Sequence, residues 1–283
     1  MKSSFLTRIF LTSFVITCLI SGCLSDNNND NSSHLSLALT DGAIDFAEQV
    51  NLTVTGVELK SNSDNPSFTF PARTINLLSL QGSQSETLFT DEELPAGEYQ
   101  WLRLMVDSAS IVLEADGGEI LLTIPSSDQT GFKLVSGFTL PSNTNANFTL
   151  DFDVRKSITV SGPVNNLSYK LRPTMRLVNN IEVGHIQGTV NGTLCDVEAS
   201  MAVYAYENHD AVVDDEGSDN PPVTSSLVSN SFDYEIGFLT AGNYTIALTC
   251  MADDDTALAD EAIIFIAVQN VLVAANQTDH YSF

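Results

Sequence analysis

Short alternating apolar segments, separated by turn-forming residues, run through most of this chain and restrict it to a β architecture. Residues 35–39 and 50–59 alternate between apolar and polar side chains, as strands with one buried face do. No segment shows a sustained apolar repeat of 3.6 residues. Many short strands with turns between them are typical of sandwiches and barrels. We therefore expect an all-β protein built from two β-sandwich domains.

Further strands are predicted on both sides of residue 180. In the first half they fall at 68–70, 75–80, 99–106, 110–114, 120–124, 132–138, 147–154 and 169–177. In the second half they fall at 186–190, 199–206, 232–236, 244–250, 263–268 and 280–283. The length of 283 residues suffices for two ordinary domains, which we place at 34–180 and 181–283.

The first 22 residues are typical of a secretory signal. Lys2 and Arg8 precede an uncharged segment, Ile9–Ile20, that is too short to span a bilayer. Residues 19–23, Leu-Ile-Ser-Gly-Cys, resemble a bacterial lipobox. We expect cleavage between Gly22 and Cys23 and a lipid on the Cys23 thiol. A plain secretory signal with an incidental cysteine is the alternative.

The residues after the signal indicate where such a lipoprotein resides. The residue that follows Cys23 is Leu24, whereas Asp at this position retains Gram-negative lipoproteins on the inner membrane. We therefore expect a lipid-anchored protein of the cell envelope, on the outer membrane if the organism has one. Residues 23–33 are polar after Leu24, and we interpret them as a flexible tether.

The charge balance excludes one class of partner. Eleven Lys and Arg stand against 36 Asp and Glu, for a formal net charge of −25. Nucleic acid needs clustered bases, so it is excluded as a partner. Glycans and envelope proteins stay open as partners, as does a charge that serves only solubility in a saline medium.

The segment from Ile181 to Phe283 contains 17 acidic residues and no Lys or Arg. Its acids cluster in two loops that each follow a predicted strand, so we expect the loops at one end of the sandwich. A hard cation would relieve the mutual repulsion of such carboxylates. Calcium is the candidate, and a solvated acidic surface is the alternative. The candidate ligands are Asp210, Asp214, Asp215, Glu216, Asp219, Asp253, Asp254 and Asp255.

Two further groups of residues have structural interpretations. Cys195 and Cys250 are predicted to form a disulfide in an oxidising compartment, with two free buried thiols as the alternative.

Strand alternation places Asp151 and Asp153 on one face, and Lys170 and Arg172 on one face of a later strand. We interpret these four as an ion-pair network between strands, with a polar pocket for a glycan or metal as the alternative.

The sequence contains no recognisable catalytic motif. G-x-S-x-G, H-E-x-x-H, the phosphate-binding loop and the dinucleotide fingerprint are all missing. We expect a non-catalytic lipoprotein that acts as a binding or adhesion module. A structural subunit of an envelope assembly is the alternative, and a calcium-dependent surface module or an envelope hydrolase is less favoured.

A short motif occurs in both halves of the chain. Residues 94–99, Leu-Pro-Ala-Gly-Glu-Tyr, match residues 239–244, Leu-Thr-Ala-Gly-Asn-Tyr. Glycine permits a sharp reversal, and the tyrosine two residues later is expected to fold back onto the core. The element resembles the hairpin of transthyretin-like modules such as carboxypeptidase regulatory-like domains, so an immunoglobulin- or transthyretin-like fold is implied for 181–283.

A longer resemblance covers about 34–178. It rests on Leu39–Ala43, Val54–Val57, Ile75–Leu80, Leu94–Tyr99, Thr130–Leu134, Leu150–Val154 and Tyr169–Pro173. In order and spacing these segments resemble the bacterial lipoprotein family catalogued as domain-of-unknown-function family 4382. One departure is Asp41-Gly42-Ala43, where the family usually has Asp-Ala-Pro. The family carries no established activity, so the resemblance implies architecture and location.

Overall fold

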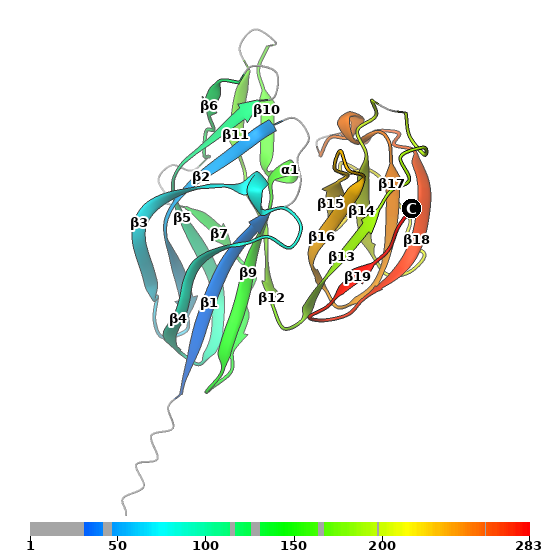
Figure 1. Cartoon of the computed structure of the whole chain (residues 1–283). Helices are drawn as coiled ribbons and strands as arrows, with labels where there is room; N and C mark the ends of the chain where they lie inside the picture. The colour runs from blue at the N-terminus through cyan, green and yellow to red at the C-terminus, as the bar shows by residue number, and fades with distance from the viewer. Residues whose placement is uncertain are drawn as a thin grey trace, which may run out of the picture. The chain divides into compact units, whose positions relative to one another are not determined.

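The computed structural model describes residues 31–41, 47–113, 117–125, 131–163, 167–196, 198–257 and 259–283. Residues Asn31–Phe283 form one compact unit, and its regular structure is almost entirely β, which confirms the predicted fold class (Figure 1). The predicted signal peptide, Cys23 and most of the tether lie outside the described residues. No described helix is long and apolar enough to cross a membrane.

The first group of strands begins with a four-stranded sheet in the order β12-β9-β1-β4. Strand β1 (Ser32–Asp41) pairs in parallel with β9 (Asn145–Asp153) and antiparallel with β4 (Glu86–Pro95), while β12 (Thr174–Asn179) pairs antiparallel with β9. Leu35, Leu37 and Leu39 alternate with half-buried residues along β1, so one face of this sheet is apolar.

A second sheet covers that face. It contains β3 (Ser67–Asn76), β2 (Ala47–Ser61) and the long β5 (Gly97–Leu113), to which β6 (Glu119–Leu121), β7 (Phe132–Leu134) and β8 (Phe138–Leu140) are added. One hydrophobic core joins the two sheets, with Leu52, Leu104 and Phe152 fully buried in it. Beside the sheets lie helix α1 (Val154–Ser157) and the ribbon of β10 (Ile158–Ser161) and β11 (Ser168–Leu171).

The second group of strands has its own core. One sheet has the order β16-β13-β19, formed by Asp233–Thr240, Val183–Thr189 and Thr278–His280. The other has the order β15-β14-β17-β18, formed by Thr224–Leu227, Ala202–Glu207, Gly242–Thr249 and Phe265–Val273. Ile186, Ile236 and Ile246 are buried in the core shared by these sheets. Two such groups of packed sheets are the sandwich arrangement expected from the alternation.

The motif found twice in the sequence forms the same hydrogen bond twice. The Tyr99 hydroxyl donates to the carbonyl of Pro95, and the Tyr244 hydroxyl donates to the carbonyl of Thr240, each at 2.9 Å. Both rings are buried. Gly97 has a φ of +140°, which other residues rarely adopt. Each tyrosine therefore fixes the chain just before the strand on which it lies.

Several elements differ from the sequence prediction. Only Ile75 and Asn76 of the predicted strand 75–80 belong to a strand, because Leu77–Leu80 form the 3-10 helix η1, capped by the Asn76 side chain. The predicted strands 99–106 and 110–114 are joined in β5. Strands β4, β10 and β15 and helix α1 were not predicted. Strand β1 begins at Ser32, two residues before the predicted start of the first domain.

Candidate functional site

Both acidic loops cross the outer face of the sheet that contains β14 and β17. Because these strands are antiparallel, loop 208–223 leaves one end of the sheet and loop 250–264 leaves the other. The expectation that both loops lie at one end is therefore wrong. They meet over the outer face, where Tyr204 and Tyr206 form a small apolar cluster with residues of both loops.

Close backbone contact joins the two loops at Gly217. A Cβ atom at Gly217 would lie 1.8 Å from the carbonyl oxygen of Ala259, so no side chain fits there. The 3-10 helix η2 (Ala252–Asp254) opens the second loop, and the Tyr206 hydroxyl accepts a hydrogen bond from the Asp214 backbone N–H at 3.1 Å in the first. These contacts fix where the carboxylates of both loops lie.

Arg155, on α1 of the first group of strands, extends into this cluster. Its guanidinium donates to the carbonyls of Ala252 at 2.8 Å and of Asp255 at 3.0 Å, and to the Tyr204 hydroxyl at 3.2 Å. Its Nη1 lies 3.9 Å from Oε1 of Glu216. With 7% of its surface exposed, Arg155 is a buried cation beside loops that contain no Lys or Arg of their own.

Lys156, the next residue, pairs with the buried carboxylate of Glu216. Its Nζ lies 3.0 Å from Oε2 of Glu216 and 3.5 Å from Oδ2 of Asp153, and it donates to the Pro222 carbonyl at 2.9 Å. Burial acts to lower the pKa of Lys156, but the two carboxylates raise it overall. Burial raises the pKa of Glu216, which Lys156 opposes. Glu216 is therefore occupied by protein groups, although its sequence position suggested a calcium ligand.

Asp255 is also occupied by protein donors. Its carboxylate accepts from the Tyr204 hydroxyl and, at 3.1 Å, from the Glu216 backbone N–H. Burial raises the pKa of Asp255, and the hydrogen bond from Tyr204 and the charge of Arg155 oppose this. An interior carboxylate needs such partners because burial removes its hydration.

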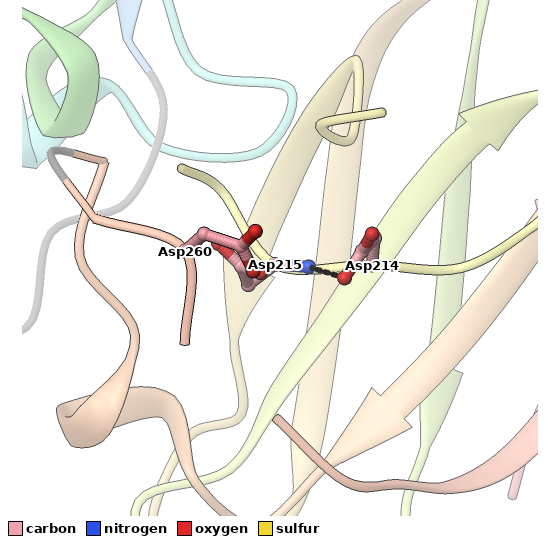
Figure 2. A group of neighbouring side chains, drawn as sticks. All are labelled: Asp214, Asp215 and Asp260. Atoms are coloured by element: carbon pink, nitrogen blue, oxygen red, sulfur yellow. Dashed lines mark hydrogen bonds between the residues drawn. The ribbon is translucent and has the colours of Figure 1, made fainter. Parts of the chain in front are cut away.

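A second set of carboxylates lies beside these ion pairs. The structure brings one carboxylate oxygen from each of Asp214, Asp215 and Asp260 within 4.8 Å of one another (Figure 2). Oδ1 of Asp214 accepts from the Asp215 backbone N–H at 3.1 Å, which holds the Asp214 side chain against the backbone of the next residue. Asp260 comes from the other loop and is exposed. The charge of Asp215, followed by burial and the charge of Asp214, raises the pKa of Asp260.

Asp215 is the buried member of this set, with 0% of its surface exposed. Its Oδ1 accepts from the Gly217 backbone N–H at 2.8 Å, whereas its Oδ2 is buried and has no hydrogen-bond partner in the described structure. Asp215 also belongs to an overlapping group with Asp255 and Glu261. There Glu261 accepts from the Thr256 hydroxyl at 2.8 Å, so that group is better supplied with donors.

The other predicted calcium ligands lie apart from these groups. Asp210 is exposed and accepts from the Asn270 amide at 2.8 Å, Asp219 is exposed, and Asp253 and Asp254 are exposed on η2. Of the eight predicted ligands, Asp214, Asp215 and Asp255 fall in the two carboxylate groups. Asp260 and Glu261 complete the groups and were missing from the prediction. Only the fold of the second loop shows that they approach the first.

The predicted polar network has different basic members. Asp151 pairs with Arg176 of β12 at 2.6 Å, not with Lys170 or Arg172. Asp153 caps α1 by accepting from the Lys156 backbone N–H at 3.0 Å and pairs with the Lys156 side chain. In the described part of the chain, no ion pair includes Lys170 or Arg172. The cause is the topology, because β9 pairs with β12, whereas Lys170 lies on β11, which pairs with β10.

The predicted disulfide is confirmed. Cys195 and Cys250 are bonded, with their Cα atoms 5.7 Å apart, and the alternative of two free thiols is therefore wrong. The bond joins the segment before β14 to the first residue after β17. Since Cys250 directly follows β17, the bond fixes the base of the second acidic loop.

The strand that follows this loop has an apolar, unpaired edge. Strand β18 is the last in its sheet and pairs only with β17 among the described strands. Its exposed side chains include Ile266, Val268 and Leu272, which are 42%, 51% and 55% exposed. The Tyr281 hydroxyl bonds both the N–H and the carbonyl of Leu272 at 3.1 Å. The backbone groups of Leu272 therefore already have a partner. The Tyr281 hydroxyl forms no such bond with Ile266 or Val268 in the described structure.

Comparisons with solved structures give weak likenesses. A minor pilin of Streptococcus agalactiae is 11% identical with a TM-score of 0.22, over 88% of this chain and 94% of that one. A putative cell adhesion protein of Parabacteroides distasonis is 12% identical with a TM-score of 0.23, over 85% of this chain and 83% of that one. TM-scores this low support no statement on fold or function. A search of curated proteins finds no match.

A family comparison identifies the family of the first group of strands. Residues 32–173, half of the chain, match the family described as "Domain of unknown function (DUF4382)". This match confirms the resemblance that was based on segments between residues 39 and 173. The chain therefore belongs to the DUF4382 family.

Proposed function

We propose that this chain is a non-catalytic, lipid-anchored protein of the cell envelope, and that its second group of strands binds another envelope protein along β18. The anchor is the lipid on Cys23, supported by the lipobox-like sequence Leu-Ile-Ser-Gly-Cys. The non-catalytic role is supported by the sequence, which contains none of the common catalytic motifs.

The apolar edge of β18 is the observation that carries the binding proposal. Proteins normally protect the edges of their sheets with charges, prolines or short strands. Strand β18 is nine residues long, and its sequence Phe-Ile-Ala-Val-Gln-Asn-Val-Leu-Val contains neither a charge nor a proline. A partner segment that adds a strand here would gain main-chain hydrogen bonds and cover Ile266 and Val268.

The charge around β18 defines the chemistry of that partner. No Lys or Arg occurs between Ile181 and Phe283, while 17 acidic residues do. A partner segment with alternating apolar side chains and flanking Lys or Arg residues fits such an edge, because opposite potentials steer association and disfavour acidic competitors.

Site-specific crosslinking in the native bacterium tests the proposal on the full-length chain. A photoreactive residue at Val268 is expected to give a discrete adduct, whereas one at Leu121 of β6, which is 75% exposed, is expected to give none. Ile266→Lys, combined with the photoreactive residue at Val268, adds the charge that protected edges carry and is expected to abolish the adduct without lowering the thermal stability.

The identity of the adduct decides between interpretations. An adduct with a second protein that contains a basic, alternating segment supports the binding module. An adduct between two copies of this chain instead supports the alternative of a structural subunit. Equal crosslinking at Val268 and Leu121, or full crosslinking from Val268 in the Ile266→Lys variant, contradicts the role of β18. Loss of labelled fatty acid from Cys23→Ala, with retention in the native chain, tests the anchor separately.

A further inference from the structure

We propose that Asp214, Asp215 and Asp260 form a binding site for a single calcium ion. The site lies between the two acidic loops and does not depend on a partner at β18. Its ligand set differs from the set expected from the sequence, since it excludes Glu216 and includes Asp260.

The buried Asp215 carboxylate shows that this is more than an acidic surface. Its Oδ2 has no hydrogen-bond partner in the described structure, and Asp215 is 0% exposed. No ion pair joins Asp214, Asp215 or Asp260 to a base within the described residues. Burying a carboxylate oxygen without a partner is costly, and a cation would supply the interaction that Oδ2 lacks.

The neighbouring carboxylates provide an internal comparison. Glu216 and Asp255 are also buried, yet Lys156, Arg155 and the Tyr204 hydroxyl supply their partners. These two buried carboxylates are therefore compensated by protein groups. The set containing Asp215 gathers three carboxylates that form no ion pair with a base within the described residues.

The geometry and the donor chemistry fit calcium. Calcium binds oxygen ligands at about 2.3–2.6 Å, so two ligands of one ion lie up to about 5 Å apart. One oxygen from each of the three residues lies within 4.8 Å of the other two. All three donors are carboxylate oxygens, which favour a hard cation over zinc or copper. Magnesium requires shorter, near-octahedral bonds, which suit a set drawn from two loops less well.

The loops hold this set before any ion binds. Gly217 contacts the backbone at Ala259, next to Asp260, and its N–H is bonded to Asp215. The disulfide of Cys250 fixes the start of the second loop. An ion shared by Asp215 and Asp260 would join the two loops across the sheet.

Calorimetric titration of the purified full-length chain with calcium chloride tests the proposal. The protein is first stripped with chelator, and about 150 mM NaCl screens diffuse attraction to the acidic surface. We expect one calcium ion per chain. Asp260→Asn, at an exposed position, and Asp215→Asn, which preserves the side-chain shape, are each expected to weaken binding by about tenfold or more.

Asp254→Asn is the matched control. It removes the same charge from an exposed position in the same loop but outside the carboxylate set, so calcium affinity is expected to stay within about twofold. The proposal is overturned if no binding heat is seen up to about 10 mM calcium. It is also overturned if Asp254→Asn weakens binding as much as Asp260→Asn, or if magnesium binds as tightly as calcium.

Thermal unfolding gives a readout that does not depend on calorimetry. In chelator, Asp260→Asn is expected to raise the melting temperature, because it removes repulsion from Asp215 and Asp214. In calcium, the native chain is expected to gain stability that Asp260→Asn does not gain. A melting temperature of the native chain that is unaffected by calcium would count against the site.

Discussion

Replacing Arg155 with methionine tests the buried ion pairs between the two groups of strands most directly. The change leaves the Ala252 and Asp255 carbonyls, bonded at 2.8 and 3.0 Å, without their donor. Each buried acceptor that loses its partner costs about 1–3 kcal/mol. Removing one partner of a buried ion pair costs about 3–5 kcal/mol.

In this variant Lys156 still pairs with Glu216 at 3.0 Å. The cost of losing Arg155 therefore lies at the lower end of the range of about 3–5 kcal/mol. We expect Arg155→Met to lower the free energy of unfolding by about 3 kcal/mol. For a unit of this size, about 2–4 °C per kcal/mol gives a fall in melting temperature of about 6–12 °C. The methionine fills much of the volume of the arginine, so little of the loss comes from a cavity.

Urea and thermal unfolding of the full-length chain measure this loss. Trp101, the single tryptophan, lies on β5 and reports the first group of strands, while near-ultraviolet circular dichroism reports tyrosines such as Tyr204 in the second. Arg172→Met is the matched control, because Arg172 is exposed and forms no ion pair in the described structure. The control removes the same charge and is expected to change stability by less than about 0.5 kcal/mol.

A loss of less than about 1 kcal/mol for Arg155→Met would fall in the range of surface ion pairs and refute this reasoning. Equal losses for Arg155→Met and Arg172→Met would have the same meaning, since they would assign the effect to net charge. A full loss that appears in the tyrosine signal but leaves the Trp101 transition unchanged would show that Arg155 stabilises only the second group of strands.

Three further predictions follow from named contacts. Replacing Cys195 and Cys250 with alanine opens a loop of 55 residues and should lower the free energy of unfolding by about 4 kcal/mol, measured by urea unfolding; a loss below about 1 kcal/mol would contradict the chain-entropy argument. Tyr99→Phe and Tyr244→Phe remove equivalent hydrogen bonds and should each cost about 0.5–1.5 kcal/mol, with similar values for the two. Burial lowers the pKa of His185 below its ordinary value of 6.5, so the folded chain takes up this proton later than the unfolded chain as pH falls. Stability should therefore decline as pH drops through 6.5, and His185→Gln should flatten this part of the pH profile of melting temperature.

The alternation of side chains predicted much of the fold but failed where strands lie at an edge or where a polar side chain redirects the backbone. Strands β1, β2 and β9 have regular buried positions that the sequence displays directly. Strand β4 was missed because only Leu88 and Leu94 are buried in its acidic sequence. Residues 77–80 were assigned to a strand because they are apolar. The Asn76 side chain accepts a hydrogen bond from the Leu78 N–H and closes a 3-10 turn there.

The acidic loops show why residue counts over a segment predict a site only in part. The absence of Lys and Arg after Ile181 suggested that all the loop carboxylates lack nearby cations. Arg155 and Lys156 correct this, because topology places α1 against residues that follow it by 49 to 100 positions. Those two cations compensate Glu216 and Asp255 and thereby remove them as candidate ligands. What is left is a smaller set around Asp215 whose charge the described protein groups do not compensate. The candidate site is therefore found by setting aside the carboxylates that pair with Arg155 and Lys156. Only the structure shows which carboxylates these are.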